Sequence, residues 1–396
     1  MIHPERHCAL SARPWDAGEA RAAIDEIAVD AIGKFDSRKF WPAHPQDEGA
    51  QGAACLYFGA AGVVWALDYL GRNGFAAARH DFRAALPAIV ARSTAWIAKG
   101  PDASYSGYGS LLLGDLGALL VAMRIEPQRE TADRICARIK DNDAMPVNEL
   151  MWGTPGSMIG CIHMLAMTGE ARFETLYRAQ AARLLAGLED DTEGLLWTQK
   201  LYGHSVRYVG AVHGFAGNIA ALVAGWSLLD GAQRAIVETA TGRTLAAQAK
   251  EDEDGVNWPA TTAPNKPIFL CQHCHGAPGM VTTLAGAPFS TPELEALLLS
   301  GGTLTWNAGP LAKGSNLCHG TGGNGYAFLK LYRRTGDAPW LERARRFAMT
   351  AIEQVRAARA QYGQGRYSLW TGDLGLAVYL LDCIRGEAKF PTVDVF

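Results

Sequence analysis

Cysteine and histidine stand side by side at two places in the sequence, and glycine follows each time. Residues 274–276 and 318–320 both read Cys-His-Gly, and His213 precedes another glycine. Thiolate and imidazole are the ligands that zinc prefers in proteins, and three protein ligands leave a fourth position open for chemistry. One such pair would be explained equally well as small core residues beside a turn. Two matched pairs predict a metal site.

The glycines belong to a longer repeat. A pattern of Gly-x-x-Gly followed by an apolar stretch recurs seven times, at intervals of 39 to 62 residues, as in FGAAGVVWAL and TGDLGLAVYL. The first glycines of the seven pairs are Gly59, Gly114, Gly153, Gly214, Gly276, Gly320 and Gly372. Because glycine lets backbones approach closely and permits positive φ, each pair is expected at a tight turn where a buried helix begins. A repeat of this length indicates one structural unit per glycine pair.

Amphipathic helical patterns lie between the glycine pairs. Apolar residues recur every three or four positions, with charges on the opposite face, over 17–35, 128–140, 172–188 and 340–360. The segments that follow the glycines carry fewer charges, and short extended pieces such as 195–201 are expected in connections. We therefore predict an all-α fold, an α/α toroid of about seven inner and seven outer helices. A linear solenoid is the alternative, but only a closed ring would bring equivalent turns together.

Composition limits the function further. The formal net charge is −3 and the sequence pI is about 6.4, a balance that predicts neither a nucleic-acid nor a membrane partner. The first fifteen residues have no apolar leader-like stretch, and eight cysteines in 396 residues do not suggest a disulfide framework. These features predict a cytoplasmic protein. The most loop-like stretch, 251–267, falls within one repeat interval, so residues 1–396 are expected to form one domain.

At this point the sequence resembles a known family. The segments HCHGAPG and LCHGTGGNGY, with HGFAGN and NELMWGTPG upstream, are similar to lanthionine synthetase C-like (LanC-like) proteins, and the resemblance extends from Gly59 to Leu380. The resemblance implies an α/α toroid with a central Zn²⁺. It also implies that Cys274, Cys318 and His319 hold the zinc.

The chemistry implied by the resemblance is thiol addition. Zinc lowers the pKa of an incoming thiol, and the thiolate attacks the β-carbon of a dehydroalanine or dehydrobutyrine in a peptide. The enolate that forms needs a proton and stabilisation of its oxygen. His213 is similar to the acid–base histidine of the family. His275 lines the pocket, protonates the enolate or is structural, and Glu149 is either an acidic residue of the site or a helix cap.

The same resemblance leaves the thiol donor open. Lanthipeptide cyclases join a peptide's own cysteine to its dehydrated residue, whereas eukaryotic LanC-like proteins add glutathione to dehydroamino acids. The chain contains no dehydratase-sized region, so dehydration is expected on a separate protein.

Departures from the family pattern lie near the first Cys-His-Gly box. His273 stands where these proteins usually carry tryptophan, and Leu270 where they often carry a basic residue, with Lys266 nearby. Lys313, five residues before Cys318, is a candidate substitute. Cys271 forms a C-x-x-C spacing with the box and is interpreted as a core thiol.

Two other functions compete with thiol addition. A glycoside hydrolase on the same fold would use paired carboxylates, for which Asp115 and Asp373 in two GDLG turns are candidates, although both could instead cap helices. A non-catalytic thiol- or peptide-binding protein would hold zinc through four protein ligands. This second alternative requires Cys271 or His273 to be the fourth zinc ligand.

Overall fold

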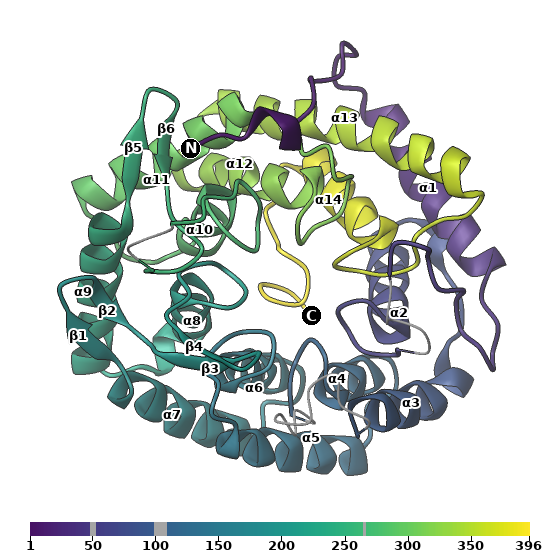
Figure 1. The fold of residues 1–396 in the computed structure, drawn as a ribbon. Helices are drawn as coiled ribbons and strands as arrows, with labels where there is room; N and C mark the ends of the chain where they lie inside the picture. The colour runs from purple at the N-terminus through teal and green to yellow at the C-terminus, as the bar shows by residue number, and fades with distance from the viewer. Residues whose placement is uncertain (48–52, 99–108, 264–266) are drawn as a thin grey trace.

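The structure, a computed structural model, describes residues 1–47, 53–98, 109–263 and 267–396, and its α-helices there form two concentric rings (Figure 1). The inner ring consists of α2 (Ala60–Arg72), α4 (Asp115–Ile125), α6 (Thr154–Thr168), α8 (Phe215–Ala224), α10 (Ala277–Leu284), α12 (Thr321–Thr335) and α14 (Asp373–Arg385). The outer ring consists of α1 (Ala17–Gly33), α3 (Leu86–Ala98), α5 (Arg129–Asp141), α7 (Ala171–Ala186), α9 (Gly231–Gln248), α11 (Pro292–Ala308) and α13 (Ala338–Tyr362). Among the described residues this makes seven inner and seven outer helices, which confirms the predicted α/α toroid.

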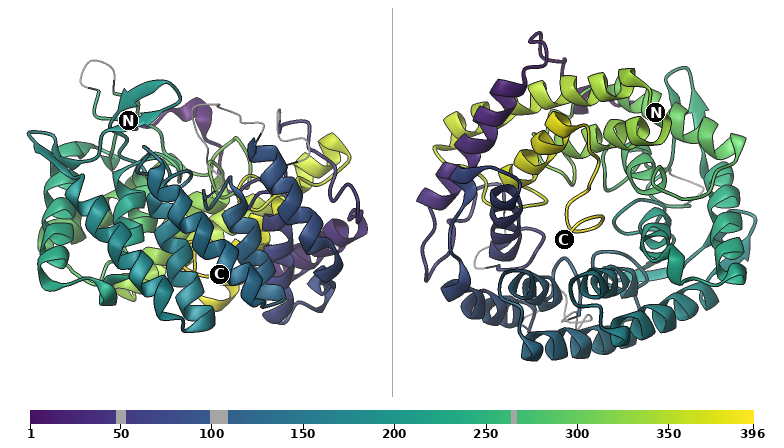
Figure 2. Two further views of the ribbon diagram at one scale, coloured as in Figure 1. Left: turned by 90° about the horizontal axis from the view of Figure 1, so that it is seen from below. Right: turned by 180° about the vertical axis from the view of Figure 1, so that it is seen from behind.

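The inner ring is closed. Each inner helix packs against the next one in sequence, and α14 packs against α2, so the last helix meets the first. On the outside, α1 packs against both α13 and α14, and the view from behind shows the same closure (Figure 2). A linear solenoid would leave its two terminal repeats apart, so the structure excludes that alternative.

The glycine pairs mark the start of every inner helix. The first glycine of each of the seven pairs is the N-cap residue. A Cβ on the second glycine would lie only 1.7–2.4 Å from the carbonyl oxygen six residues earlier, where the preceding loop folds back onto the helix. The predicted close approach is therefore confirmed. Positive φ is not the general reason, because among the first glycines only Gly276 adopts it (φ 103°).

The outer helices match the amphipathic patterns to within a few residues, and most of them end or begin with recognisable caps. In α9 the Asp230 side chain accepts from the Gln233 amide and the Gln233 side chain accepts from Asp230 in return, which satisfies two backbone donors at the helix start. At the C-terminal end of α13, Gly363 is the cap residue and adopts a left-handed conformation (φ 68°).

Strands occur only in short antiparallel hairpins within the described residues. The pairs are β1 (Glu189–Asp191) with β2 (Gly194–Leu196), β3 (Gln199–Leu201) with β4 (His204–Val206), and β5 (Lys250–Asp252) with β6 (Gly255–Asn257). Single 3₁₀ turns occur at η1 (Pro4–Arg6), η2 (Ala76–Ala78), η3 (Arg83–Ala85), η4 (Asn142–Ala144) and η5 (Trp226–Leu228). The predicted connection 195–201 thus falls in β2 and β3, whereas 251–267 holds most of the β5–β6 hairpin. In side view the hairpins and the N-terminus lie at one end of the ring (Figure 2).

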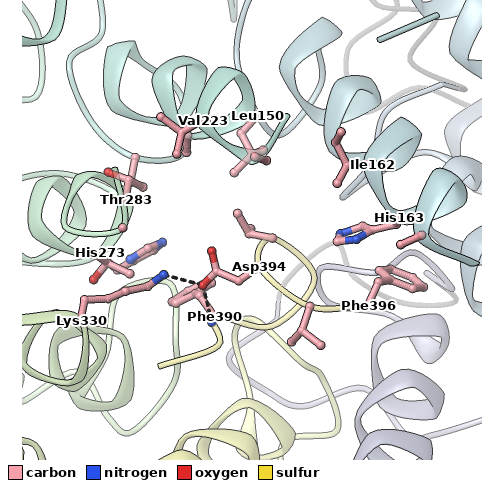
Figure 3. Close-up of a pocket in the computed structure, with 18 of the residues that line it drawn as sticks. Leu150, Ile162, His163, Val223, His273, Thr283, Lys330, Phe390, Asp394 and Phe396 are labelled. Carbon is pink, nitrogen blue, oxygen red and sulfur yellow. Dashed lines mark hydrogen bonds and ion pairs between the residues drawn. The ribbon is translucent and has the colours of Figure 1, made fainter. Parts of the chain in front are cut away.

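The chain ends inside the ring. After α14, residues 387–396 enter the lumen and turn back on themselves, so that the C-terminus lies near the centre of the view (Figure 1). Asp394 and Phe390 exchange hydrogen bonds that close this turn, and Asp394 forms an ion pair of 2.7 Å with Lys330 of α12 (Figure 3). The lumen is therefore filled in part by the chain's own tail.

None of the helices in the described residues has the length and apolar character that crossing a lipid bilayer requires.

Candidate functional site

A cavity of about 800 Å³ lies at the end of the ring where the inner helices begin. Equivalent residues of different repeats line this cavity. In six of the seven repeats, the residue just before the first glycine is part of its wall. These residues are Phe58, Leu113, Trp152, His213, His319 and Thr371. In the remaining repeat the equivalent residue is His275, whose ring lies 6.1 Å from that of His213. Because the ring is closed, the turns before the inner helices come together and form the wall of one cavity.

The two Cys-His-Gly loops meet beside this cavity. The Cys274 amide donates to the Cys318 carbonyl (3.0 Å), and the two thiols are hydrogen-bond partners. Gln272 donates to the sulfur of Cys274 (2.9 Å) and in turn accepts from Arg6 (2.9 Å). Both cysteines are buried and unbridged. The predicted meeting of the two boxes across α10 and α12 is confirmed.

In the described part of the chain, no three His, Cys, Asp or Glu side chains gather as a preformed metal site. The two thiols are together, and His319 follows Cys318 and faces the cavity. Two adjacent thiols and a neighbouring imidazole are nevertheless a donor set that suits zinc.

The titrating groups of these loops influence one another. The hydrogen bond from Cys318 holds the pKa of Cys274 below its usual value, although burial opposes this, and the same bond together with burial raises the pKa of Cys318. Burial lowers the pKa of His319 to about 4 and that of His275 to about 4. Both imidazoles are therefore neutral near pH 7, the state in which histidine can donate an electron pair.

His213 is held by a buried carboxylate. Glu149 is fully buried and accepts from His213 Nδ1 (2.9 Å), from the Met151 amide (3.0 Å) and from the Trp152 amide. The N-cap of α6 is Gly153, with no side-chain cap, so Glu149 does not cap the helix in the predicted sense. With Nδ1 bound, Nε2 is the ring nitrogen of His213 that remains for a substrate in the cavity.

His275 lies close to the loop that precedes α8. A Cβ at Gly210 would lie 2.4 Å from the Cys274 carbonyl and 3.0 Å from His275 Nδ1, so only glycine allows this contact. His275 is partly buried, and its Nδ1 is buried with no hydrogen-bond partner among the described residues. The structure thus brings His275 next to His213 and Cys274.

The C-terminal tail supports both cysteine loops from the lumen. Phe390 stacks on His273, the neighbour of Cys274, with ring centroids 4.3 Å apart (Figure 3). The carbonyl of Trp370 accepts from the Cys318 amide (3.0 Å), while the Trp370 indole donates to the Thr392 hydroxyl (3.2 Å).

The aspartates of the two GDLG turns point away from the cavity. Asp115 and Asp373 are the first residues of α4 and α14, and neither caps its helix by a side-chain hydrogen bond. Asp115 pairs with Arg138 of α5 (2.9 Å), and Asp373 with Arg359 of α13 (2.9 Å). Both carboxylates therefore tie the inner ring to the outer ring, which argues against a glycosidase pair and corrects the expectation of helix caps.

Comparison with known proteins identifies the family. Residues 53–395 match the lanthionine synthetase C-like protein family. The chain belongs to the LanC-like family. It is 32% identical over 200 residues to "LanC-like protein GCL1" of Arabidopsis thaliana, which covers 48% of this chain and 44% of that protein. It is 35% identical over 130 residues to "Glutathione S-transferase LANCL1" of Danio rerio, 32% of either chain. The chain thus matches less than half the length of these curated relatives.

Among solved structures, "Nisin cyclase" is similar with a TM-score of 0.59 at 13% identity, over 92% of both chains. At that identity the similarity shows the fold.

In this LanC-like chain, Cys271 and His273, two residues near the first Cys-His-Gly box, have their side-chain contacts away from the thiol pair. Cys271 is buried and hydrogen-bonded to Thr305 of α11, and His273 stacks on the tail. Neither therefore joins Cys274 and Cys318 to complete a closed four-ligand set. Lys266 lies outside the described residues, whereas Lys313 lines the cavity together with His319.

Several residues beside the thiol pair and in the cavity wall of this LanC-like chain were not predicted from the sequence. The hydroxyl of Tyr57 is a hydrogen-bond partner of the Cys318 thiol, and Gln272 holds Cys274. Trp152 and Tyr202 close another side of the cavity through an indole–hydroxyl hydrogen bond of 3.1 Å. For Tyr57 and Trp152 a signal existed, because both stand within two residues of a first glycine. Gln272 and Tyr202 had none.

Proposed function

We propose that the chain catalyses zinc-dependent addition of a thiol to a dehydroalanine or dehydrobutyrine residue of a peptide, forming a thioether. The observation that carries this proposal is the pairing of the Cys274 and Cys318 thiols beside a cavity that also receives the carboxylate-held imidazole of His213. Membership of the LanC-like family supports it.

Cys274, Cys318 and His319 would hold the zinc. The donor set fits, because the thiols are already in contact and the imidazole is neutral and faces the cavity. Zinc bound there would lower the pKa of a thiol and so supply thiolate at neutral pH. The candidates for completing a closed, purely structural site face elsewhere, so a position remains for a substrate.

The rest of the reaction is proton movement, which the chain's own residues supply. As the sulfur–carbon bond forms at Cβ, the electron pair of the double bond moves onto Cα and the carbonyl oxygen. His213 takes the proton lost by the thiol and returns it at Cα from Nε2, so the reaction is balanced with no oxidant or reductant. Glu149 keeps the imidazole oriented and stabilises it while protonated. His275, beside it, is placed to contact the enolate oxygen.

The thiol donor is expected to carry a negative charge. Arg366 in the cavity wall is neutralised by Asp47, whereas Lys313 has no carboxylate within salt-bridge distance in the described part of the chain. A free ammonium beside His319 suits a donor with a carboxylate, such as glutathione, and the name of the Danio rerio relative agrees with this choice. The cysteine of a peptide is the other candidate. A separate dehydratase would supply the dehydroamino acid, and a reducing, cytoplasmic setting would keep the thiol pair free.

The test combines metal content and turnover. After dialysis, we expect about one zinc per wild-type chain and none in Cys318→Ala, which should lose thiol addition to a dehydroalanine peptide. His213→Asn should keep its zinc and be slower by about 10²–10⁴. An active, metal-free Cys318→Ala would refute the proposal.

Matched variants separate site effects from folding. Cys271→Ser removes a buried thiol from the same loop without touching the pair, so it should retain zinc and activity. Lys313→Ala should raise KM for glutathione but leave KM for 2-mercaptoethanol, an uncharged thiol, unchanged. Equal effects on both thiols would exclude Lys313 as the carboxylate partner.

A further inference from the structure

The cavity has two chemically different halves. Seven of its fourteen lining residues are apolar or aromatic, namely Tyr57, Phe58, Trp96, Leu113, Met151, Trp152 and Tyr202. Most of them come from the turns before α2, α4 and α6, which are neighbours in the inner ring, whereas His213, Lys313 and His319 belong to the turns before α8 and α12. The apolar residues therefore line one part of the cavity, called the apolar wall below, and the histidines and Lys313 line another.

Contacts between neighbouring side chains hold two parts of this wall in place. The rings of Phe58 and Trp96 meet edge to face, with centroids 5.4 Å apart, and Tyr57 lies 5.6 Å from Phe58. The Trp152 indole is bonded to the Tyr202 hydroxyl, so these polar groups are satisfied and the rings offer apolar surface. The wall is thus a preformed surface of aromatic rings.

Both ends of the apolar wall touch the proposed reacting groups. At one end the Tyr57 hydroxyl bonds the Cys318 thiol, and at the other the ring of Tyr202 lies edge-on to His213, with centroids 5.9 Å apart. A dehydroamino acid placed between thiol and imidazole would therefore have its neighbouring side chains directed along this wall, since successive residues of an extended peptide advance by about 3.3 Å.

We propose that this wall is a subsite for a bulky apolar or aromatic side chain next to the reacting residue of the peptide substrate. Phe58 and Trp96 are the specificity-determining residues, because both are only partly buried and keep ring surface available. A charged side chain would lose its hydration there without meeting a partner on the wall. This inference rests on the proposed function, since it assigns that site a class of peptide.

The experiment compares three short peptides in which dehydroalanine is flanked by Phe, Ala or Asp, with glutathione as the thiol. We expect wild-type kcat/KM to be about tenfold higher for the Phe peptide than for the Asp peptide, a ratio that corresponds to about 1.4 kcal/mol. Phe58→Ser and Trp96→Ala should reduce the ratio to within twofold. Wild-type turnover of N-acetyl-dehydroalanine methylamide, a minimal substrate with no flanking side chain, measures the reaction without the subsite.

A matched control and a binding measurement complete the design. Phe289→Ser truncates a partly buried ring that packs on Trp226 outside the cavity, and it should keep the full Phe:Asp ratio. Equal rates for the three peptides in the wild type, or an unchanged ratio in both wall variants, would overturn the inference. If the minimal substrate is not turned over, the proposed function fails instead. The subsite is then decided by calorimetric binding of unreactive peptides with alanine in place of dehydroalanine.

Discussion

Replacing Glu149 by glutamine tests whether the buried carboxylate orients the His213 imidazole and stabilises its protonated form. The carboxylate accepts three hydrogen bonds with two oxygens, from the His213 ring and from the Met151 and Trp152 amides. A glutamine side chain has one acceptor oxygen, so at least one of the three donors must face its NH₂ group. An unpaired buried amide costs about 1–3 kcal/mol, which lowers stability without unfolding an ordinary domain.

The rate effect follows from the lost charge. A hydrogen bond to a charged group contributes about 1.5–3 kcal/mol, and at about 1.4 kcal/mol per factor of ten this predicts a kcat lower by about 10–100-fold. The loss should be smaller than in His213→Asn, which removes the imidazole itself. Because the two residues act as one unit, the double variant should be no slower than His213→Asn alone.

The assay measures kcat, zinc content and unfolding by denaturant for each variant. Asp115→Asn is the matched control, since it neutralises another fully buried carboxylate that pairs with Arg138. It should lower stability while leaving the rate per folded chain unchanged. If the effects of Glu149→Gln and His213→Asn add in the double variant, or if kcat of Glu149→Gln stays within twofold of wild type, the assignment of Glu149 is refuted.

Three further predictions concern the tail, a buried carboxyl and the glycine repeat. Phe390→Ala should weaken zinc retention against a chelator by about tenfold and alter the spectrum of the Co²⁺-substituted protein. Phe396→Ala should do neither, because its ring lies against His163 of α6. Burial raises the pKa of Asp382 to about 7, so the folded state holds its proton more tightly than the unfolded chain. The free energy of unfolding relative to that of Asp382→Asn should therefore fall as the pH rises from about 4 to about 7, and an unchanged difference would contradict this. Gly323→Ala should destabilise the folded protein by about 3 kcal/mol, because its Cβ would lie 1.7 Å from a carbonyl oxygen. Gly242→Ala, in open space on α9, should stabilise it by about 0.5–1 kcal/mol. Thermal unfolding of both variants measures these changes.

The fold could be predicted because its defining contacts are local. The second glycine of each pair meets a carbonyl only six residues away, so the same short pattern is required wherever an inner helix begins, and it recurs visibly along the chain. The meeting of Cys274 and Cys318 followed from their equivalent positions in repeats that a closed ring places side by side.

What the sequence did not predict depends on contacts between distant segments. Arg6 reaches Gln272 across more than 260 residues, and Phe390 reaches His273 only because the chain end enters the lumen. No periodic pattern marks such contacts, since each occurs once. The expectation that Asp115 and Asp373 cap helices was wrong for a related reason, because the arginines that bind them lie on outer helices whose rotation the pattern does not fix.

The two residues on either side of the first glycine have different roles in this ring. The residue before the first glycine faces the cavity in repeat after repeat, whereas the residue after it begins the helix and meets the outer ring, as Asp115, Thr154 and Asp373 do with arginines of α5, α7 and α13. Histidine occupies the cavity position in three consecutive repeats, and aromatic or apolar residues occupy it in the first three. The side chains at a single repeated position therefore divide the cavity into a half with histidines and a half with aromatic or apolar residues.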